Sequence, residues 1–140
     1  MPAGLERDVQ ELYDYVNKLI NTAESRGDLS ECVDDNTCWT IRNRLISRVQ
    51  KMMNKVLALE KIAKDNDQRE YYSNIHDILN NMYQAIFRCP DEYDEDDEEE
   101  ENCTTWSYIL SSLMGIQGYL EVLMELLSQG DQGGRTLVFK

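Results

Sequence analysis

Residues 109–127 read ILSSLMGIQGYLEVLMELL, the most apolar stretch of the chain. Apolar residues recur there at alternating steps of four and three, the spacing that places side chains on one face of an α-helix. The stripe consists of Ile109, Leu113, Ile116, Leu120, Leu123 and Leu127, and it is widened by Leu110, Met114 and Met124. So wide an apolar face predicts a helix at residues 104–128 that lies deepest in a bundle. Thr104 or Thr105 is placed to cap its start, and Gly130 to close its end.

Three further segments have the same period, with charged residues on their other faces. We expect these helices at residues 5–25, 39–64 and 68–88. The last of them ends before Cys89-Pro90, because proline disfavours a helical residue before it. A chain of 140 residues is long enough for one domain with a single core. The sequence therefore predicts an all-α four-helix bundle over residues 1–130, followed by a disordered, Gly-rich tail at 131–140.

Four cysteines lie in the expected connections between helices. Cys32 and Cys38 precede the second helix, and Cys89 and Cys103 lie between the third and the fourth. An even number of cysteines fits a disulfide framework, and neither spacing matches a usual zinc site. Disulfides favour a secreted protein. Because no cleavable signal opens the chain, we expect a mature form to which Met1 was added.

Charge and apolar content limit the class of partner. The net charge is -13, and ten of the eleven residues at 91–101 are acidic, which predicts a solvated loop at 90–102. This run lacks the glycine and the ligand spacing of a calcium loop. Nucleic acid and anionic membranes would repel such a chain. No apolar run reaches the roughly 18 residues that span a bilayer, so no membrane insertion is expected.

The residues offer no catalytic constellation. His76, the only histidine, lies beside the apolar stripe of the third helix, and no nucleophile is placed near it by sequence. There is no glycine-rich phosphate loop, so we expect neither an enzyme nor a cofactor or metal site. Arg26-Gly27-Asp28 spells an integrin-type tripeptide, but matches of three residues are common by chance. Asn102-Cys103-Thr104 is formally a glycosylation sequon, with a cysteine in its middle that we expect to be bonded.

Three local patterns point to a known family. Residues 12–19 read LYDYVNKL, Cys32 and Cys38 are separated by five residues with Trp39 directly after the second, and residues 109–120 have apolar positions four, seven and eleven beyond the first. Together these patterns resemble the short-chain four-helix cytokines. The resemblance is closest to the interleukin-2, interleukin-15 and interleukin-21 group, which signals through the common gamma chain. The first pattern is similar to the Leu-x-x-Tyr-Val-Asn-x-Leu stretch of interleukin-21.

The resemblance implies an up-up-down-down bundle and a secreted, monomeric signalling ligand that holds two receptor ectodomains together. The first and third helices would meet a private receptor chain, and the first and fourth a shared chain such as the common gamma chain. The candidate receptor contacts are Asp8, Glu11, Asp14, Tyr15, Lys18, Asn74, Asp77, Asn81, Gln117, Tyr119 and Glu121. A glutamine of the family's last helix aligns with Gly118, one residue after Gln117. The family pairing implies bonds from Cys32 to Cys89 and from Cys38 to Cys103.

Alternatives remain at two points. About 12 residues join the first two helices and reach roughly 40 Å when extended, just enough to travel back along a 20-residue helix of about 30 Å. An up-down-up-down bundle brings all four cysteines to one end and allows pairing of Cys32 with Cys38 and of Cys89 with Cys103. The alternative function is an intracellular acidic adaptor or inhibitor that binds a basic partner through residues 91–101. A plant-type pectin methylesterase or invertase inhibitor has a cysteine hairpin before its bundle, and none is present here.

Overall fold

The computed structural model describes residues 4–92 and 103–130. Within these ranges it contains four α-helices, α1 (Leu5–Glu24), α2 (Asp35–Lys61), α3 (Asn66–Gln84) and α4 (Trp106–Gly130), and one short 3₁₀ helix, η1 (Pro90–Glu92). The predicted all-α four-helix bundle is confirmed. Most of the expected acidic loop and the whole expected tail, residues 93–102 and 131–140, lie outside the described residues.

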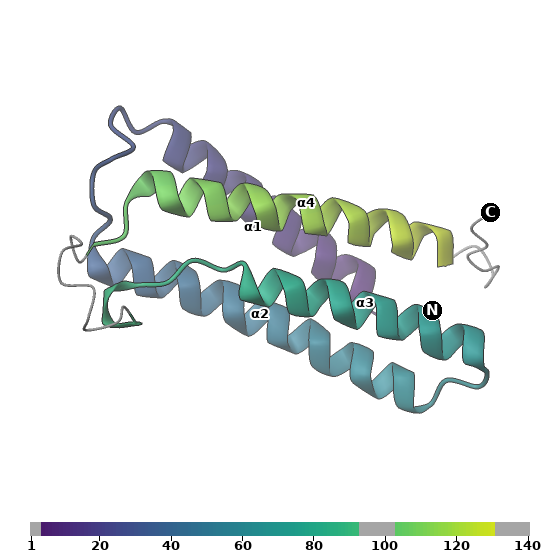
Figure 1. Ribbon diagram of the computed structural model, residues 1–140. Helices are drawn as coiled ribbons and strands as arrows, with labels where there is room; N and C mark the ends of the chain where they lie inside the picture. The colour runs from purple at the N-terminus through teal and green to yellow at the C-terminus, as the bar shows by residue number, and fades with distance from the viewer. Residues whose placement is uncertain (1–3, 93–102, 131–140) are drawn as a thin grey trace.

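Successive helices run in opposite directions (Figure 1). The start of α1 meets the end of α2 through Asp8 and Lys55, and the start of α4 meets the end of α3, where the Ser112 hydroxyl donates to the Ala85 carbonyl at 2.6 Å. At the other end of the α3–α4 pair, Tyr71 of α3 donates a hydrogen bond to the backbone of α4. The bundle is therefore up-down-up-down, and the expected up-up-down-down order is wrong.

The first connection explains this topology. Residues 25–34 join α1 to α2 and use their length in local structure instead of a crossover: the Asp28 carboxylate accepts bonds from Ser30, and the backbone of Val33 pairs with that of Thr104. An isolated β-bridge joins Cys32 to Thr105. Ten residues folded in this way cannot return along the roughly 30 Å of α1, so α2 begins at the end where α1 finishes.

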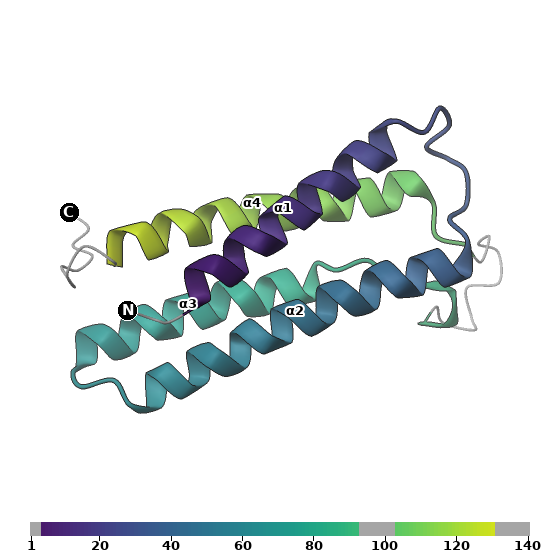
Figure 2. The ribbon, with the colours of Figure 1, turned by 180° about the vertical axis from the view of Figure 1, so that it is seen from behind.

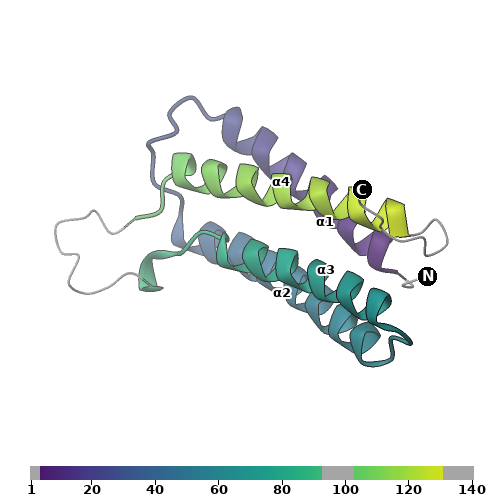
Figure 3. The ribbon, with the colours of Figure 1, turned by 45° about the vertical axis from the view of Figure 1, so that its right-hand side comes forward.

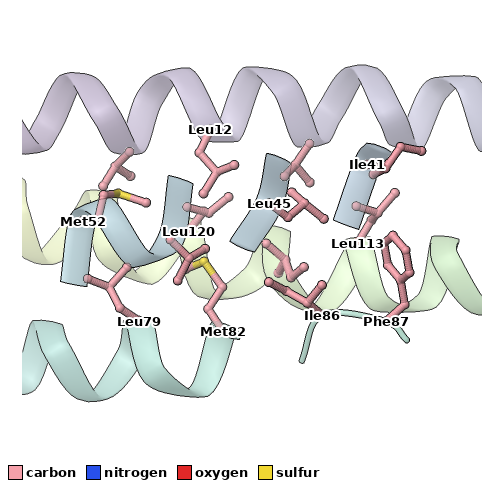
Figure 4. Close-up of a cluster of buried hydrophobic side chains, with 14 of the residues drawn as sticks. Leu12, Ile41, Leu45, Met52, Leu79, Met82, Ile86, Phe87, Leu113 and Leu120 are labelled. Carbon is pink, nitrogen blue, oxygen red and sulfur yellow. The ribbon is translucent and has the colours of Figure 1, made fainter. Parts of the chain in front are cut away.

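The four helices form two antiparallel pairs (Figures 2 and 3). Helix α1 packs chiefly on α4, and α2 chiefly on α3, so that α1 and α3 lie on a diagonal of the bundle, as do α2 and α4. Side chains from all four helices point to a common core, which includes Leu12, Leu45, Leu79 and Leu120 (Figure 4). All six residues of the stripe in 109–127 are buried. Helix α4 therefore has the inward face that its sequence predicts.

Capping residues set several helix ends, and some of these ends differ from the expected ones. Helix α2 begins four residues before position 39, because the Asp34 side chain accepts a hydrogen bond from the backbone N–H of Thr37. Asp65 caps α3 in the same way. Thr105, one of the two threonines expected to cap the fourth helix, accepts from the N–H of Tyr108.

Helix α3 ends four residues before the expected position 88. The segment 85–89 leaves the helix, which allows Ile86, Phe87 and Cys89 to be buried together. Side chains from other elements bind its backbone carbonyls: Arg42 of α2 donates to Phe87, and the buried Thr104 hydroxyl donates to Arg88 at 2.9 Å. These bonds satisfy the carbonyls of Phe87 and Arg88 outside the helix.

Two disulfides join the cysteine-bearing end of the bundle, and all four cysteines are bonded. The bonds link Cys32 to Cys103 and Cys38 to Cys89. This is the third of the three possible connectivities, so the pairing implied by the cytokine resemblance is wrong, and so is the pairing that the simpler bundle was expected to allow. The physical reason is the β-bridge, which places Cys32 next to the segment that enters α4, while Cys38 faces the core at the start of α2 and meets the buried Cys89.

Candidate functional site

Helix α4 exposes apolar and small residues on its outer side, beside its two carboxylates, Glu121 and Glu125. Ser111, Met114, Gly115, Gly118 and Val122 are exposed on this side at helical spacing, and we call this set the α4 outer face. The side chains of Met114 and Val122 are 51% and 50% exposed. The whole helix of 25 residues contains only two charged residues, although 29% of the chain is charged. An exposed apolar surface of this kind on a polar protein marks a candidate binding site.

The two glycines of the α4 outer face have no packing role within the described residues. A Cβ atom built on Gly115 or Gly118 meets no atom within 4 Å. Glycine inside a helix costs roughly 0.5–1 kcal/mol relative to alanine, because it orders more of the unfolded backbone. No close contact among the described residues requires a glycine at either position. The glycines would, however, allow another molecule to approach the backbone of α4 closely.

Polar side chains line the seam between α1 and α4. The Gln117 amide donates to the Asn17 side-chain oxygen at 2.6 Å, and the Tyr13 hydroxyl donates to the Glu121 carboxylate at 3.0 Å. Gln117 is half-buried and Glu121 exposed. Both are candidate receptor contacts from the sequence, and both have their polar groups at the α1/α4 seam, beside the α4 outer face.

The candidate contacts on α1 divide between two sides of that helix. Asp14 and Lys18 are exposed on its outer side, where Asp14 accepts a hydrogen bond from Gln10. Asp8 and Tyr15 face α2 instead. The Asp8 carboxylate is 16% exposed and pairs with Lys55, and the Tyr15 ring lies under the Arg48 guanidinium. Glu11 is exposed and forms an i,i+4 ion pair with Arg7.

The candidate contacts on α3 form a surface of their own. Asn74, Asp77 and Asn81 are all exposed and follow one another at steps of three and four. Because α1 and α3 lie on a diagonal of the bundle, these residues do not join the candidates of α1 in one face. The joint surface of first and third helices that the resemblance implies is absent from this fold.

Gln117 and Tyr119 also lie on different sides of α4. Two residues of a helix are separated by about 200 degrees around its axis. Tyr119 is seven residues from both Ser112 and Leu126, whose hydrogen bonds reach α3, whereas Gln117 bonds to α1. The three candidates on α4 therefore do not form one patch. Met114, Gly118 and Val122 were not expected as contacts, although their i,i+4 spacing was readable from the sequence.

The integrin-type tripeptide lies in an exposed turn, and both of its charges have local partners. Arg26 pairs with Glu31 at 3.3 Å and lies over the Trp106 ring. The Asp28 carboxylate accepts from the hydroxyl and the backbone N–H of Ser30, and these bonds lower its pKa. The turn therefore has a structural use for both charges.

In the part of the chain that the structure describes, no three His, Cys, Asp or Glu residues are grouped as metal ligands would be. His76 is half-buried on α3. Contrary to expectation, one helix passes the length and composition test for a membrane span: residues Trp106–Gln129 of α4. Its inner stripe forms the bundle core, and core helices of soluble proteins pass the same test.

Comparison with known proteins adds no relative. No family model, no curated protein and no solved structure matches this chain.

Proposed function

We propose that the protein is a secreted signalling ligand that does no chemistry and acts by binding a receptor ectodomain through α4 and its seam with α1. The observation that carries the proposal is the α4 outer face, which exposes Met114 and Val122 beside two glycines that the fold does not need. The binding surface consists of the α4 outer face together with Gln117, Glu121, Asp14 and Lys18.

This surface has an apolar centre at Met114 and Val122 and a polar edge. Interfaces have a core depleted in charge and enriched in methionine and aromatic residues, with a polar rim. Met114 and Val122 are two turns apart, about 12 Å along the axis, and the exposed glycines between them let a partner's backbone come close. Gln117 and Glu121 supply polar groups at the α1 edge, where their side chains are already ordered by Asn17 and Tyr13. Ordered groups cost less entropy on binding.

Secretion is supported by the two disulfides, which persist in oxidising compartments. The signalling class is supported by the resemblance of residues 12–19, 32–39 and 109–120 to the common-gamma-chain cytokines. The proposal departs from that family's mechanism at one point. It keeps the surface of first and fourth helices and omits a joint surface of first and third. The intracellular adaptor gains no support, since its binding segment lies mostly outside the described residues and its thiols were expected to be free.

The test is a binding screen against cytokine-receptor ectodomains of the source organism, with two matched double variants. Met114→Glu/Val122→Glu places charges on the α4 outer face. Leu57→Glu/Ile62→Glu places the same charges on exposed apolar residues at the far end of α2, which are 40% and 71% exposed. We expect the first variant to lose at least tenfold in affinity, about 1.4 kcal/mol, and the second to bind as the unmodified protein does.

Two results contradict the proposal. One is that no ectodomain binds the unmodified protein at micromolar concentration. The other is that both double variants lose affinity equally. The loss would then result from the added negative charge and not from its position on the α4 outer face. Analytical ultracentrifugation of the same samples adds a control. If the unmodified protein is a dimer that dissociates only in Met114→Glu/Val122→Glu, the surface serves self-association.

A further inference from the structure

Helix α2 differs in charge from the rest of the molecule. It contains six of the chain's 14 lysine and arginine residues, and residues 36–59 include no aspartate or glutamate, although 27 of the 140 residues are acidic. Ten of the 27 carboxylates lie within residues 91–101, and without those ten the formal charge of -13 becomes -3. Charge is therefore unevenly distributed along the sequence, and the net charge of the chain does not describe the local charge of α2.

Four of these cations form one line along α2, which we call the basic row: Arg44, Arg48, Lys51 and Lys55. Steps of four, three and four residues place them on one side of the helix, over a length of about 16 Å at 1.5 Å per residue. Arg44, Arg48 and Lys51 are exposed. None of these three forms an ion pair with any residue that the structure describes. Three cations of the basic row are therefore open to an external anion.

Helix α1 orders two members of the basic row. The Arg48 guanidinium carbon lies 5.5 Å from the centroid of the Tyr15 ring, a cation–π contact. The Lys55 ammonium pairs with the Asp8 carboxylate, and the two side chains are 34% and 16% exposed. Side chains that are fixed before binding lose less rotamer entropy when a ligand arrives. The basic row is thus a partly preorganised line of positive charge.

We propose that the basic row binds a sulfated polysaccharide. A linear polyanion with sulfates along its length matches a linear row of cations, and clusters of lysine and arginine are known as heparin-type patches. The choice among polyanions follows from the extracellular location in the proposed function. Nucleic acid is an intracellular ligand, and the anionic lipids of cells face the cytoplasm.

The basic row and the α4 outer face are independent surfaces. Helices α2 and α4 lie on the other diagonal of the bundle, so the basic row borders α1 and not α4. A ligand held on cell-surface or matrix glycans through α2 keeps the α4 outer face open to a receptor. The polysaccharide site would therefore retain the protein near cells without competing with signalling.

The test uses the purified, disulfide-bonded full chain and immobilised heparin at 0.15 M salt. Arg44→Gln/Arg48→Gln/Lys51→Gln removes three charges from the basic row. Lys18→Gln/Lys61→Gln/Lys64→Gln removes three exposed lysines elsewhere and is the matched control. We expect the row variant to bind at least tenfold more weakly than the unmodified protein, with a salt dependence reduced by about one charge per cation removed. The control should bind within about threefold of the unmodified protein, with circular dichroism confirming the fold of both.

Four outcomes overturn this inference. The first three are no retention of the unmodified protein on heparin, an equal loss in both triple variants, and equal binding to hyaluronan, which has carboxylates but no sulfate. Equal binding to phosphatidylserine vesicles would overturn it as well, because the ligand would then be any anionic surface. Met114→Glu/Val122→Glu should bind heparin as the unmodified protein does. This last comparison separates failure of the polysaccharide site from failure of the proposed receptor surface.

Discussion

Replacing Gly115 and Gly118 by alanine should stabilise the protein. Both are inside α4, both are exposed, and an added Cβ meets no atom within 4 Å at either position. Each substitution removes backbone freedom from the unfolded chain and is expected to raise the free energy of unfolding by about 0.5–1 kcal/mol. Together they should add about 1–2 kcal/mol, which corresponds to roughly 3–8 °C in Tm for a chain of this size.

Gly4 provides a control with the opposite sign. It is the N-cap of α1 in a left-handed conformation, with φ of 81°, and a Cβ there would lie 3.2 Å from the Lys55 ammonium nitrogen. Gly4→Ala should therefore lower the free energy of unfolding by about 1–2 kcal/mol. Denaturant unfolding followed by circular dichroism measures all three substitutions on the same scale.

The reasoning is refuted if the double alanine variant unfolds at the same or a lower denaturant concentration than the unmodified protein. Such a result would mean that the glycines serve the fold in a way that their surroundings do not show. The glycines would then no longer support the α4 outer face as a binding site, and only its exposed apolar side chains would. A double alanine variant that is more stable but binds the receptor more weakly would support the binding site directly. The fold would then tolerate the added methyl groups, and the partner would not.

Three further predictions concern the rest of the chain. Peptide mapping of the unreduced protein should recover Cys32 linked to Cys103 and Cys38 linked to Cys89, and reduction should lower the free energy of unfolding by about 2–4 kcal/mol for each bond; recovery of Cys32 linked to Cys38 would contradict the fold. Replacing residues 94–100 by a Gly/Ser linker should leave thermal stability unchanged or slightly higher, because it removes mutual repulsion, and a large loss of receptor binding with intact folding would instead favour an acidic docking role. Asp8→Asn should cost about 1–2 kcal/mol of stability by weakening the bond to Lys55, with receptor affinity unchanged; weaker binding at unchanged stability would return Asp8 to the receptor surface.

The sequence was sufficient for the elements of the fold and for its inward faces. The period of residues 109–127 predicts which side chains of α4 are buried, and all six are. Periodicity reports which side of a helix faces inward, but it is the same for a helix that points up or down. The topology depended on the ten residues 25–34, whose turn and bridge to residues 104–107 are tertiary contacts without a sequence signature.

The candidate site was less accessible from the sequence. Matching by family pattern selected Gln117 and Tyr119 together, although their spacing of two places them on different sides of any helix. The exposed spacing of Met114, Gly118 and Val122 was present in the same sequence, but Met114 was interpreted as part of a widened core stripe. Whether such residues are buried depends on how close the neighbouring helices come. Only the packed bundle determines this distance.

The account depends most on the claim that the α4 outer face is where a receptor binds. Oxidation by hydroxyl radicals, read by mass spectrometry on the free protein and on its complex with a bound ectodomain, tests this claim side chain by side chain. Met114 on α4 should oxidise several-fold more slowly in the complex, while Tyr72 and Tyr83 of α3 should oxidise at unchanged rates. Equal oxidation of Met114 in the free and bound protein, with protection of the two tyrosines of α3, would contradict the account.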